Sequence, residues 1–359
     1  MKLNLDIFPQ ENKNSQFLNY MHLKATFNLK EIKELRGKKY FDKSHLNYYY
    51  LNQLYIEHQR RKNVPFLFMT YINPVTIKPP YIVTFHDILP WEEEFIYGAQ
   101  IYDQKRKDLI LKMSVRANRI LTVSNYSKKK IMSLFEEHNY KYNEKNIIVL
   151  PAFVNKQIFN ETKLNQGNKN KSKDAKYEIL FIGSDHIRKN HINAIIAIYI
   201  LNKKYKMNAS LTIITRKRKR YDELKALIDI YNNPLENKIT FIEYVKLEDL
   251  LGLYQKSDLL LFPSYYEGFG LPPVEAQSMG LPVVASNVSC MPEILGEGAF
   301  YVDPYDPQDI AEGMYRVLTD LDLKNKLVNK GFTNSEKYTS DKYSEKLYTI
   351  VSDLYKEYS

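Results

Sequence analysis

Apolar and polar positions follow a regular rhythm along the chain, in which short apolar runs alternate with longer stretches of mixed character. In the first part, runs rich in β-branched and aromatic residues predict strands, and the stretches 101–117 and 125–138 predict helices. A strand at 3–8 and a tyrosine-rich helix at 45–61 are weaker patterns before them. The main strands of this part are predicted at 65–72, 81–87, 119–124 and 146–151.

The same rhythm returns after residue 176. Near-continuous apolar strands that alternate with helices are typical of parallel sheets covered on both faces. The sequence therefore predicts an α/β protein with two Rossmann-like halves that face each other across a cleft. In the second half the strands are predicted at 177–183, 210–215, 239–245, 259–264 and 282–286, and the helices at 190–205, from about 221, at 247–257 and at 272–280.

A polar segment at 161–176 separates the two halves. It has one apolar residue before its alanine and no periodicity that would bury a face, so we interpret it as a solvated linker. We expect an N-terminal Rossmann-like domain at 1–160 and a C-terminal Rossmann-like domain at 177–340. A last helix at 341–359 is expected to pack back on the N-terminal domain.

Composition limits the class of protein. The 359 residues are 44% hydrophobic and 26% charged, as in soluble globular proteins, and the length allows two domains of ordinary size. Cys290 is the single cysteine, which excludes an intrachain disulfide and a cysteine-rich metal site. The first residues, MKLNLDIFPQENKN, lack the pattern of a signal peptide, and no apolar run has the length of a membrane span. We expect a cytoplasmic protein, with peripheral contact at the inner face of a membrane.

Charge is unevenly divided between the halves. Residues 1–160 contain 25 Lys+Arg against 15 Asp+Glu, which leaves 52 − 25 = 27 against 42 − 15 = 27 for the remainder. The whole formal excess of +10 therefore lies in the first part. This asymmetry predicts that the first domain faces an anionic partner, such as an anionic membrane.

A glycine-rich turn joins the predicted strand 259–264 to the predicted helix 272–280. Prolines in the first turn of that helix occupy positions where no amide donor is needed. The turn formed by Gly268, Phe269 and Gly270 lies at the carboxyl edge of a parallel sheet, where open α/β sheets bind ligands. Free backbone amides at such a helix start favour an anion, typically phosphate.

Two carboxylates, Glu267 and Glu275, lie on either side of this turn. They would repel the anion if they pointed at it, whereas an ionised carboxylate can accept two hydrogen bonds from a vicinal diol. The helical rise separates the two groups by roughly 10 Å. A molecule with a sugar at each end of a diphosphate fits that spacing, so the pattern predicts a nucleotide-sugar site.

The stretch EGFGLPPVE resembles the family 4 retaining glycosyltransferases, which have the GT-B fold, and the similarity extends over about residues 81–320. In that family the first glutamate, here Glu267, contacts the transferred sugar, and the second, here Glu275, holds the ribose. The backbone between them approaches the sugar and the phosphates. This resemblance makes Gly268, Phe269, Gly270 and Leu271 expected donor-binding residues. It also implies that the domain at 177–340 binds the nucleotide sugar and that the domain at 1–160 binds the acceptor.

The segment FIGSDHIRKN at 181–190 is similar to the family's loop that carries a lysine against the leaving diphosphate, here Lys189. Gly183 and Ser184 begin this loop. Many members have an arginine where this chain has Ser184, so either Arg188 substitutes for it or Lys189 and the backbone hold the diphosphate alone. VTFHDILP, in the first half, resembles a family segment whose histidine, here His86, lies at the donor site.

The resemblance implies a hexosyltransferase that retains the anomeric configuration and needs neither a metal nor another cofactor. We expect a nucleoside-diphosphate sugar as donor, with GDP-mannose first and UDP-glucose or UDP-N-acetylglucosamine next. The acceptor is expected to be a saccharide or lipid-linked hydroxyl in polysaccharide biosynthesis. Nucleic acid is not an expected partner. Glu267, Lys189 and His86 are the expected catalytic residues.

Three other classes are weighed against this interpretation. A glycoside hydrolase needs two carboxylates at about 5 to 9.5 Å across one bond and has no use for a phosphate turn. A dinucleotide-dependent oxidoreductase needs a G-x-G-x-x-G turn near the first strand, which this chain lacks. A non-catalytic GT-B scaffold, whose basic surface binds anionic partners, remains the alternative, because Ser184 departs from the family and the first strand has no glycine-rich loop after it.

Overall fold

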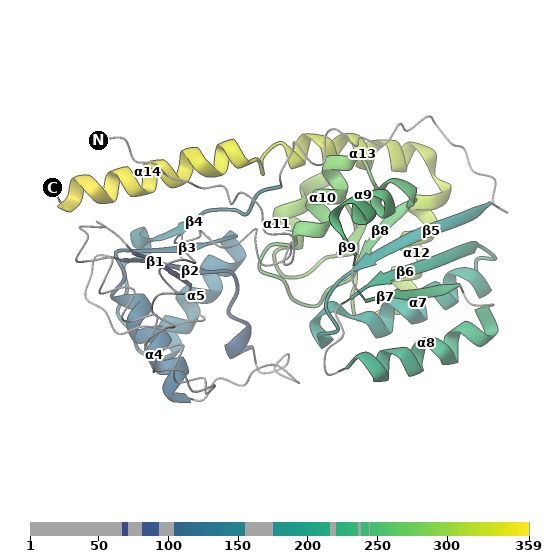
Figure 1. The fold of residues 1–359 in the computed structure, drawn as a ribbon, viewed down its shortest axis with the longest axis horizontal. Coiled ribbons are helices and arrows are strands. Elements are labelled where there is room, and N and C mark those ends of the chain that lie inside the picture. The colour runs from purple at the N-terminus through teal and green to yellow at the C-terminus, as the bar shows by residue number, and fades with distance from the viewer. Residues whose placement is uncertain are drawn as a thin grey trace, which may run out of the picture.

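The computed structural model describes residues 67–70, 81–92, 104–154, 175–215, 220–235, 238–243 and 245–358 (Figure 1). The strand predicted at 3–8 and the helix predicted at 45–61 lie outside these residues. So does most of the predicted linker, and the predicted domain boundaries therefore remain predictions.

Within the described residues, the first sheet has four parallel strands in the order β1-β2-β3-β4. The four predicted strands of this half are present, and the two predicted helices lie between them. Tyr81, Val83 and Phe85 of the sheet share one buried cluster with Ile110 and Ile131 of these helices. The elements are β1 (Leu67–Thr70), β2 (Tyr81–Phe85), η1 (Leu89–Trp91), α4 (Gln104–Val115), β3 (Arg119–Thr122), α5 (Asn125–Glu137), η3 (Glu144–Asn146) and β4 (Ile147–Val149).

Over the part of the chain that the structure describes, the second sheet has six parallel strands in the order β10-β9-β8-β5-β6-β7. The direction in which successive strands are added reverses between β5 and β8, which pair directly. Such a switch point separates the loops that follow the two strands and is where open parallel sheets bind ligands. The strands are β5 (Lys176–Ile182), β6 (Asn208–Ile214), β7 (Ile239–Ile242), β8 (Leu259–Phe262), β9 (Val283–Ser286) and β10 (Phe300–Val302).

Helices cover both faces of this sheet, as the unbroken apolar strands predict (Figure 1). Ile198, Ile228 and Met314 form a buried cluster on one face. Tyr254 and Val274 belong to a second cluster on the other. The helices are η4 (Ile187–Lys189), α7 (His191–Lys203), α8 (Tyr221–Leu235), α9 (Leu247–Lys256), α10 (Leu271–Met279), α11 (Met291–Leu295), η5 (Gly296–Gly298), α12 (Pro307–Thr319) and α13 (Leu321–Ser335).

The helix α14 (Ser340–Tyr358) leaves the second sheet and lies over the first (Figure 1). Its buried residues Leu347 and Leu354 share an apolar cluster with Ile82, Leu121 and Leu150 of the first half. The chain therefore crosses between the two halves a second time, just before α14.

Candidate active site

The loops after β5 and β8 meet at the switch point of the second sheet. Asn190 has a left-handed backbone, with φ of 62°, and its side-chain amide donates to the carbonyls of Pro263 at 2.9 Å and Pro304 at 2.7 Å. The amide of Tyr265 donates to the carbonyl of Arg188 at 2.8 Å. These bonds fix the two loops against each other, so that side chains far apart in the sequence converge.

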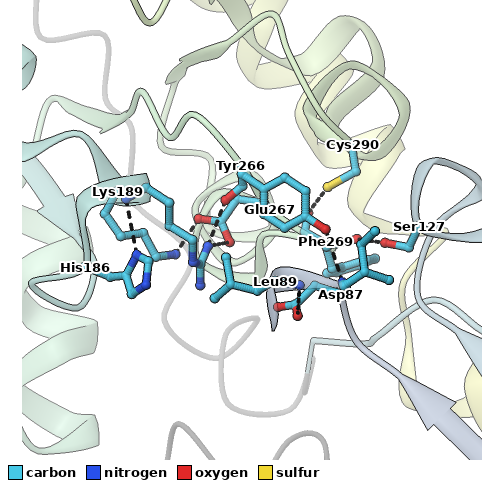
Figure 2. Close-up of polar contacts among 12 residues, drawn as sticks. Asp87, Leu89, Ser127, His186, Lys189, Tyr266, Glu267, Phe269 and Cys290 are labelled. Atoms are coloured by element: carbon cyan, nitrogen blue, oxygen red, sulfur yellow. Dashed lines mark hydrogen bonds and ion pairs between the residues drawn. The ribbon is translucent and has the colours of Figure 1, made fainter. Parts of the chain in front are cut away.

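Arg188, Lys189 and Glu267 form an ion cluster where these loops meet. Lys189 and Glu267 are labelled in Figure 2. Lys189 Nζ lies 2.5 Å from Glu267 Oε1, and an Arg188 guanidinium nitrogen lies 2.6 Å from Glu267 Oε2. Glu267 is 5% exposed and Lys189 9%. The lysine stem packs against Gly183, where an added Cβ would lie 3.2 Å from Lys189 Cγ. The sequence left open whether Arg188 takes part, and the structure places it on the same carboxylate as Lys189.

The surroundings of this cluster set its charge. Burial acts to raise the pKa of Glu267, but Arg188 and Lys189 outweigh it and lower that pKa to about 2. Burial, and then the charge of Arg188, lowers the pKa of Lys189 to about 8. At neutral pH all three groups are therefore ionised, and the cluster has one excess positive charge.

Glu275 has a different partner. It lies in the second turn of α10, is 8% exposed, and its Oε2 accepts a hydrogen bond of 2.8 Å from the hydroxyl of Tyr254. Burial raises the pKa of Glu275 to about 7, and the bond from Tyr254 offsets only part of that rise. This carboxylate therefore changes charge near neutral pH.

The turn between the two glutamates requires glycine at two positions. A Cβ at Gly268 would lie 1.8 Å from the carbonyl oxygen of His86, so no side chain fits there. Gly270 has φ of 92°, in the left-handed region, and α10 begins directly after it with Leu271, which is half-buried. The main chain of the first half thus touches the turn through His86.

Ser184 and Phe269 differ from the other predicted site residues in their surroundings. Ser184 is half-buried in the loop after β5. Phe269 is a core residue, because its ring is buried edge-on against Tyr338 at 5.2 Å. Because the ring is buried in the core, only the backbone of Phe269 is available to contact a nucleotide-sugar donor.

Several residues around the site escape local sequence patterns. Tyr254 comes from the preceding helix α9, and its apolar spacing marks it as a core position. The hydroxyl of Tyr266 accepts a bond of 3.2 Å from the amide of Ile88, which joins the two halves. Ser124 does have a signal, since a serine directly before a helix is a common N-cap. Glu293, which bonds to the start of α5, has none.

Within the described ranges, no group of three or more His, Cys, Asp or Glu side chains is arranged to hold a metal ion. In the same part of the chain, every helix is too short or too polar to cross a membrane.

This arrangement of two facing parallel sheets is the GT-B fold, which is found in glycosyltransferases. Sucrose-phosphate synthase from Thermosynechococcus elongatus superimposes with a TM-score of 0.69 over 89% of this chain and 81% of that one, at 17% identity. Residues 162–333 match the family described as glycosyl transferases group 1. This segment, a little under half of the chain, is similar to that family.

Two curated relatives of similar sequence are named as mannosyltransferases. "O-antigen chain mannosyltransferase B" of Escherichia coli is 27% identical over 269 residues, which are 72% of this chain and 66% of the relative. "O-antigen chain mannosyltransferase RfbU" of Salmonella typhimurium is 32% identical over 227 residues, which are 62% and 57% of the two chains. The matches thus span about three fifths of the length of these relatives.

Proposed function

We propose that the protein is a retaining hexosyltransferase that moves a hexose from a nucleoside-diphosphate sugar to a hydroxyl of a saccharide or lipid-linked acceptor in polysaccharide biosynthesis. The observation that carries this proposal is the cluster of Arg188, Lys189 and Glu267 beside the glycine turn at the switch point. It combines buried cations for a diphosphate with a carboxylate for sugar hydroxyls.

The ion cluster suggests how donor binding proceeds. The diphosphate takes over the hydrogen bonds of Arg188 and Lys189, and Glu267 is then released to accept bonds from the sugar hydroxyls. Because Glu267 remains ionised, it also stabilises positive charge that develops on the sugar ring. Exchange of one anion for another keeps the buried cations paired throughout.

In the proposed reaction the acceptor oxygen attacks the anomeric carbon on the face from which the diphosphate leaves. The bond between that carbon and the phosphate oxygen breaks, and its electrons remain on the diphosphate. The acceptor proton passes to a phosphate oxygen. Arg188, Lys189 and the amides at the start of α10 stabilise the charge of the leaving group, which grows toward the transition state.

GDP-mannose is the first donor to test, because the two relatives are named as mannosyltransferases. Purified protein would be incubated with GDP-mannose, UDP-glucose and UDP-N-acetylglucosamine, and release of nucleoside diphosphate measured with and without candidate acceptors. A thermal-shift series with GDP, UDP and ADP gives an independent measure, since a ligand at a hundred times its dissociation constant stabilises by about 2.7 kcal/mol.

We expect release from one donor and stabilisation by the matching diphosphate. Stabilisation by a diphosphate without turnover of any donor would contradict the enzyme and favour the scaffold. If no diphosphate stabilised the protein and no donor were turned over, the proposed nucleotide-sugar site would be refuted.

Metal independence is part of the proposal, because fixed cations occupy the place where a metal would neutralise the diphosphate. Activity should survive exhaustive EDTA treatment. Loss that manganese or magnesium restores would contradict this.

The basic excess of residues 1–160 supports an acceptor at, or embedded in, an anionic membrane surface in the cytoplasm. Because the Debye length falls from about 10 Å at 0.1 M salt to about 3 Å at 1 M, retention on anionic vesicles should fall steeply across that range. Neutral vesicles provide the control. Equal, negligible retention on both, with full activity on a neutral soluble acceptor, would refute the surface proposal.

A further inference from the structure

The start of helix α5, in the first half of the molecule, lies against the donor turn of the second half. Ser124 is the N-cap of α5, and its hydroxyl oxygen accepts a bond of 3.0 Å from the amide of Ser127. The same hydroxyl donates to the carbonyl of Gly268 at 2.8 Å. One buried serine thus begins a helix in one half and binds the backbone of the other.

Glu293, in α11, binds the same helix start from the second half. Its Oε1 accepts from the backbone amide of Asn125 at 2.6 Å and from the Asn125 side chain at 2.9 Å, and its Oε2 accepts from the amide of Tyr126 at 2.9 Å. The first amides of a helix have no partner within the helix, and the dipole there favours negative charge. The carboxylate therefore completes the capping of α5 only when the two halves are together.

These contacts constrain the peptide between Gly268 and Phe269. In a planar trans peptide the N–H points opposite to the C=O. With the Gly268 carbonyl bonded to Ser124, the amide of Phe269 points away from α5. The fit of Gly268 against the His86 carbonyl leaves this peptide no room to move toward the first half.

We propose that Ser124 and Glu293 form an interdomain clamp that orients the Gly268–Phe269 peptide toward the donor diphosphate, so that diphosphate binding and closure of the two halves are coupled. This inference rests on the proposed function. Ser124 and Glu293 act through the peptide and do not touch the donor, which makes them positioning residues. Diphosphate affinity then depends on a helix in the half that does not hold the nucleotide.

The variants Ser124→Ala and Glu293→Gln each remove part of the clamp with little change of volume. Ser124→Thr restores the hydroxyl, and Glu297→Gln removes an exposed carboxylate on the neighbouring η5 that pairs with Lys330. Thermal melting would check that all four variants fold.

Two readouts separate the clamp from the nucleotide site. Hydrogen exchange without nucleotide should accelerate in peptides covering 124–127 and 267–271 for Ser124→Ala and Glu293→Gln, and stay unchanged for Glu297→Gln. Calorimetric titration with GDP and UDP should show about tenfold weaker binding, roughly 1.4 kcal/mol, in the first two variants, with recovery in Ser124→Thr.

Unchanged exchange in Ser124→Ala and Glu293→Gln would overturn the clamp. Faster exchange with unaltered diphosphate affinity would overturn its coupling to the donor. If exchange were faster in the variants but the wild type bound neither GDP nor UDP, the contact between the halves would be supported. The proposed function would then be overturned instead.

Discussion

The surroundings of Glu267 and Glu275 differ sharply, although one turn and the start of one helix hold both. Glu267 lies between two buried cations, and its pKa falls to about 2. Glu275 has a tyrosine hydroxyl as partner, and burial raises its pKa to about 7. The first carboxylate therefore keeps a permanent charge suited to a cationic transition state. The second has a charge that pH and a bound ligand can change.

The largest effect is expected when Lys189, one of the two cations paired with Glu267, is replaced. In Lys189→Ala, turnover should fall about 100-fold, because the charge on the leaving diphosphate grows toward the transition state and loses its donor. Steady-state kinetics with the preferred donor would measure this. Lys203→Ala, at the exposed end of α7, is the control. A Lys189→Ala enzyme altered only in KM would assign the lysine to ground-state binding.

Glu267→Gln keeps the shape of the side chain and removes its charge. Turnover should fall at least tenfold, or about 1.4 kcal/mol. The free energy of unfolding should also fall by roughly 3 kcal/mol, because two buried cations lose their counter-charge. Kinetic assays and urea unfolding at neutral pH would measure the two effects.

Glu275→Gln is the matched variant, with a much smaller loss of stability at neutral pH and a defect mainly in nucleoside-diphosphate binding. Normal turnover in Glu267→Gln would remove this glutamate from the site. Equal stability losses in the two variants would abolish the distinction between the carboxylates.

The contributions of Glu267 and Glu275 to the free energy of unfolding should depend on pH in opposite directions. Glu275 ionises at about 4.5 in the unfolded chain and at about 7 in the folded one, so burial costs stability as pH rises through that window. Relative to Glu275→Gln, the wild type should lose roughly 3 kcal/mol across it. Glu267 has the lowered pKa, so its contribution is present above about 4.5 and is lost as pH falls toward about 2.

Urea unfolding of wild type and Glu275→Gln at a series of pH values between about 4 and 8 tests this difference. A constant difference between the two proteins over that range would show that Glu275 titrates outside it.

The smallest effect is expected from Tyr254→Phe, which removes the hydrogen bond to Glu275 and leaves the ring. The pKa of Glu275 should rise further, because a donated bond favours the ionised carboxylate. If the ionised form binds the ribose, the midpoint of diphosphate affinity against pH should move upward by about half a unit.

Calorimetric titration across pH would measure that midpoint, with the exposed Tyr348→Phe as control. An unmoved midpoint in Tyr254→Phe would separate the tyrosine from the charge of Glu275.

The sequence predicts those parts of the molecule that depend on local patterns. Apolar runs locate the strands, and glycines with flanking glutamates locate the turn. The contact between Tyr254 and Glu275 is not predictable in this way, because it depends on how α9 packs against α10. The contact of Glu293 with α5 is further from prediction, since it depends on how two separate sheets are placed. The three-residue strand β10 is too short to stand out from its surroundings.

The C-terminal helix α14 also bears on how the protein is made. Its residues Leu347 and Leu354 fill an apolar cluster with Ile82, Leu121 and Leu150, which the ribosome synthesises about 200 to 270 residues earlier. During translation this face of the first sheet stays uncovered while the whole second sheet is synthesised and folds. The part of the protein that emerges first is thus completed last, and in the interval it presents an apolar surface to chaperones.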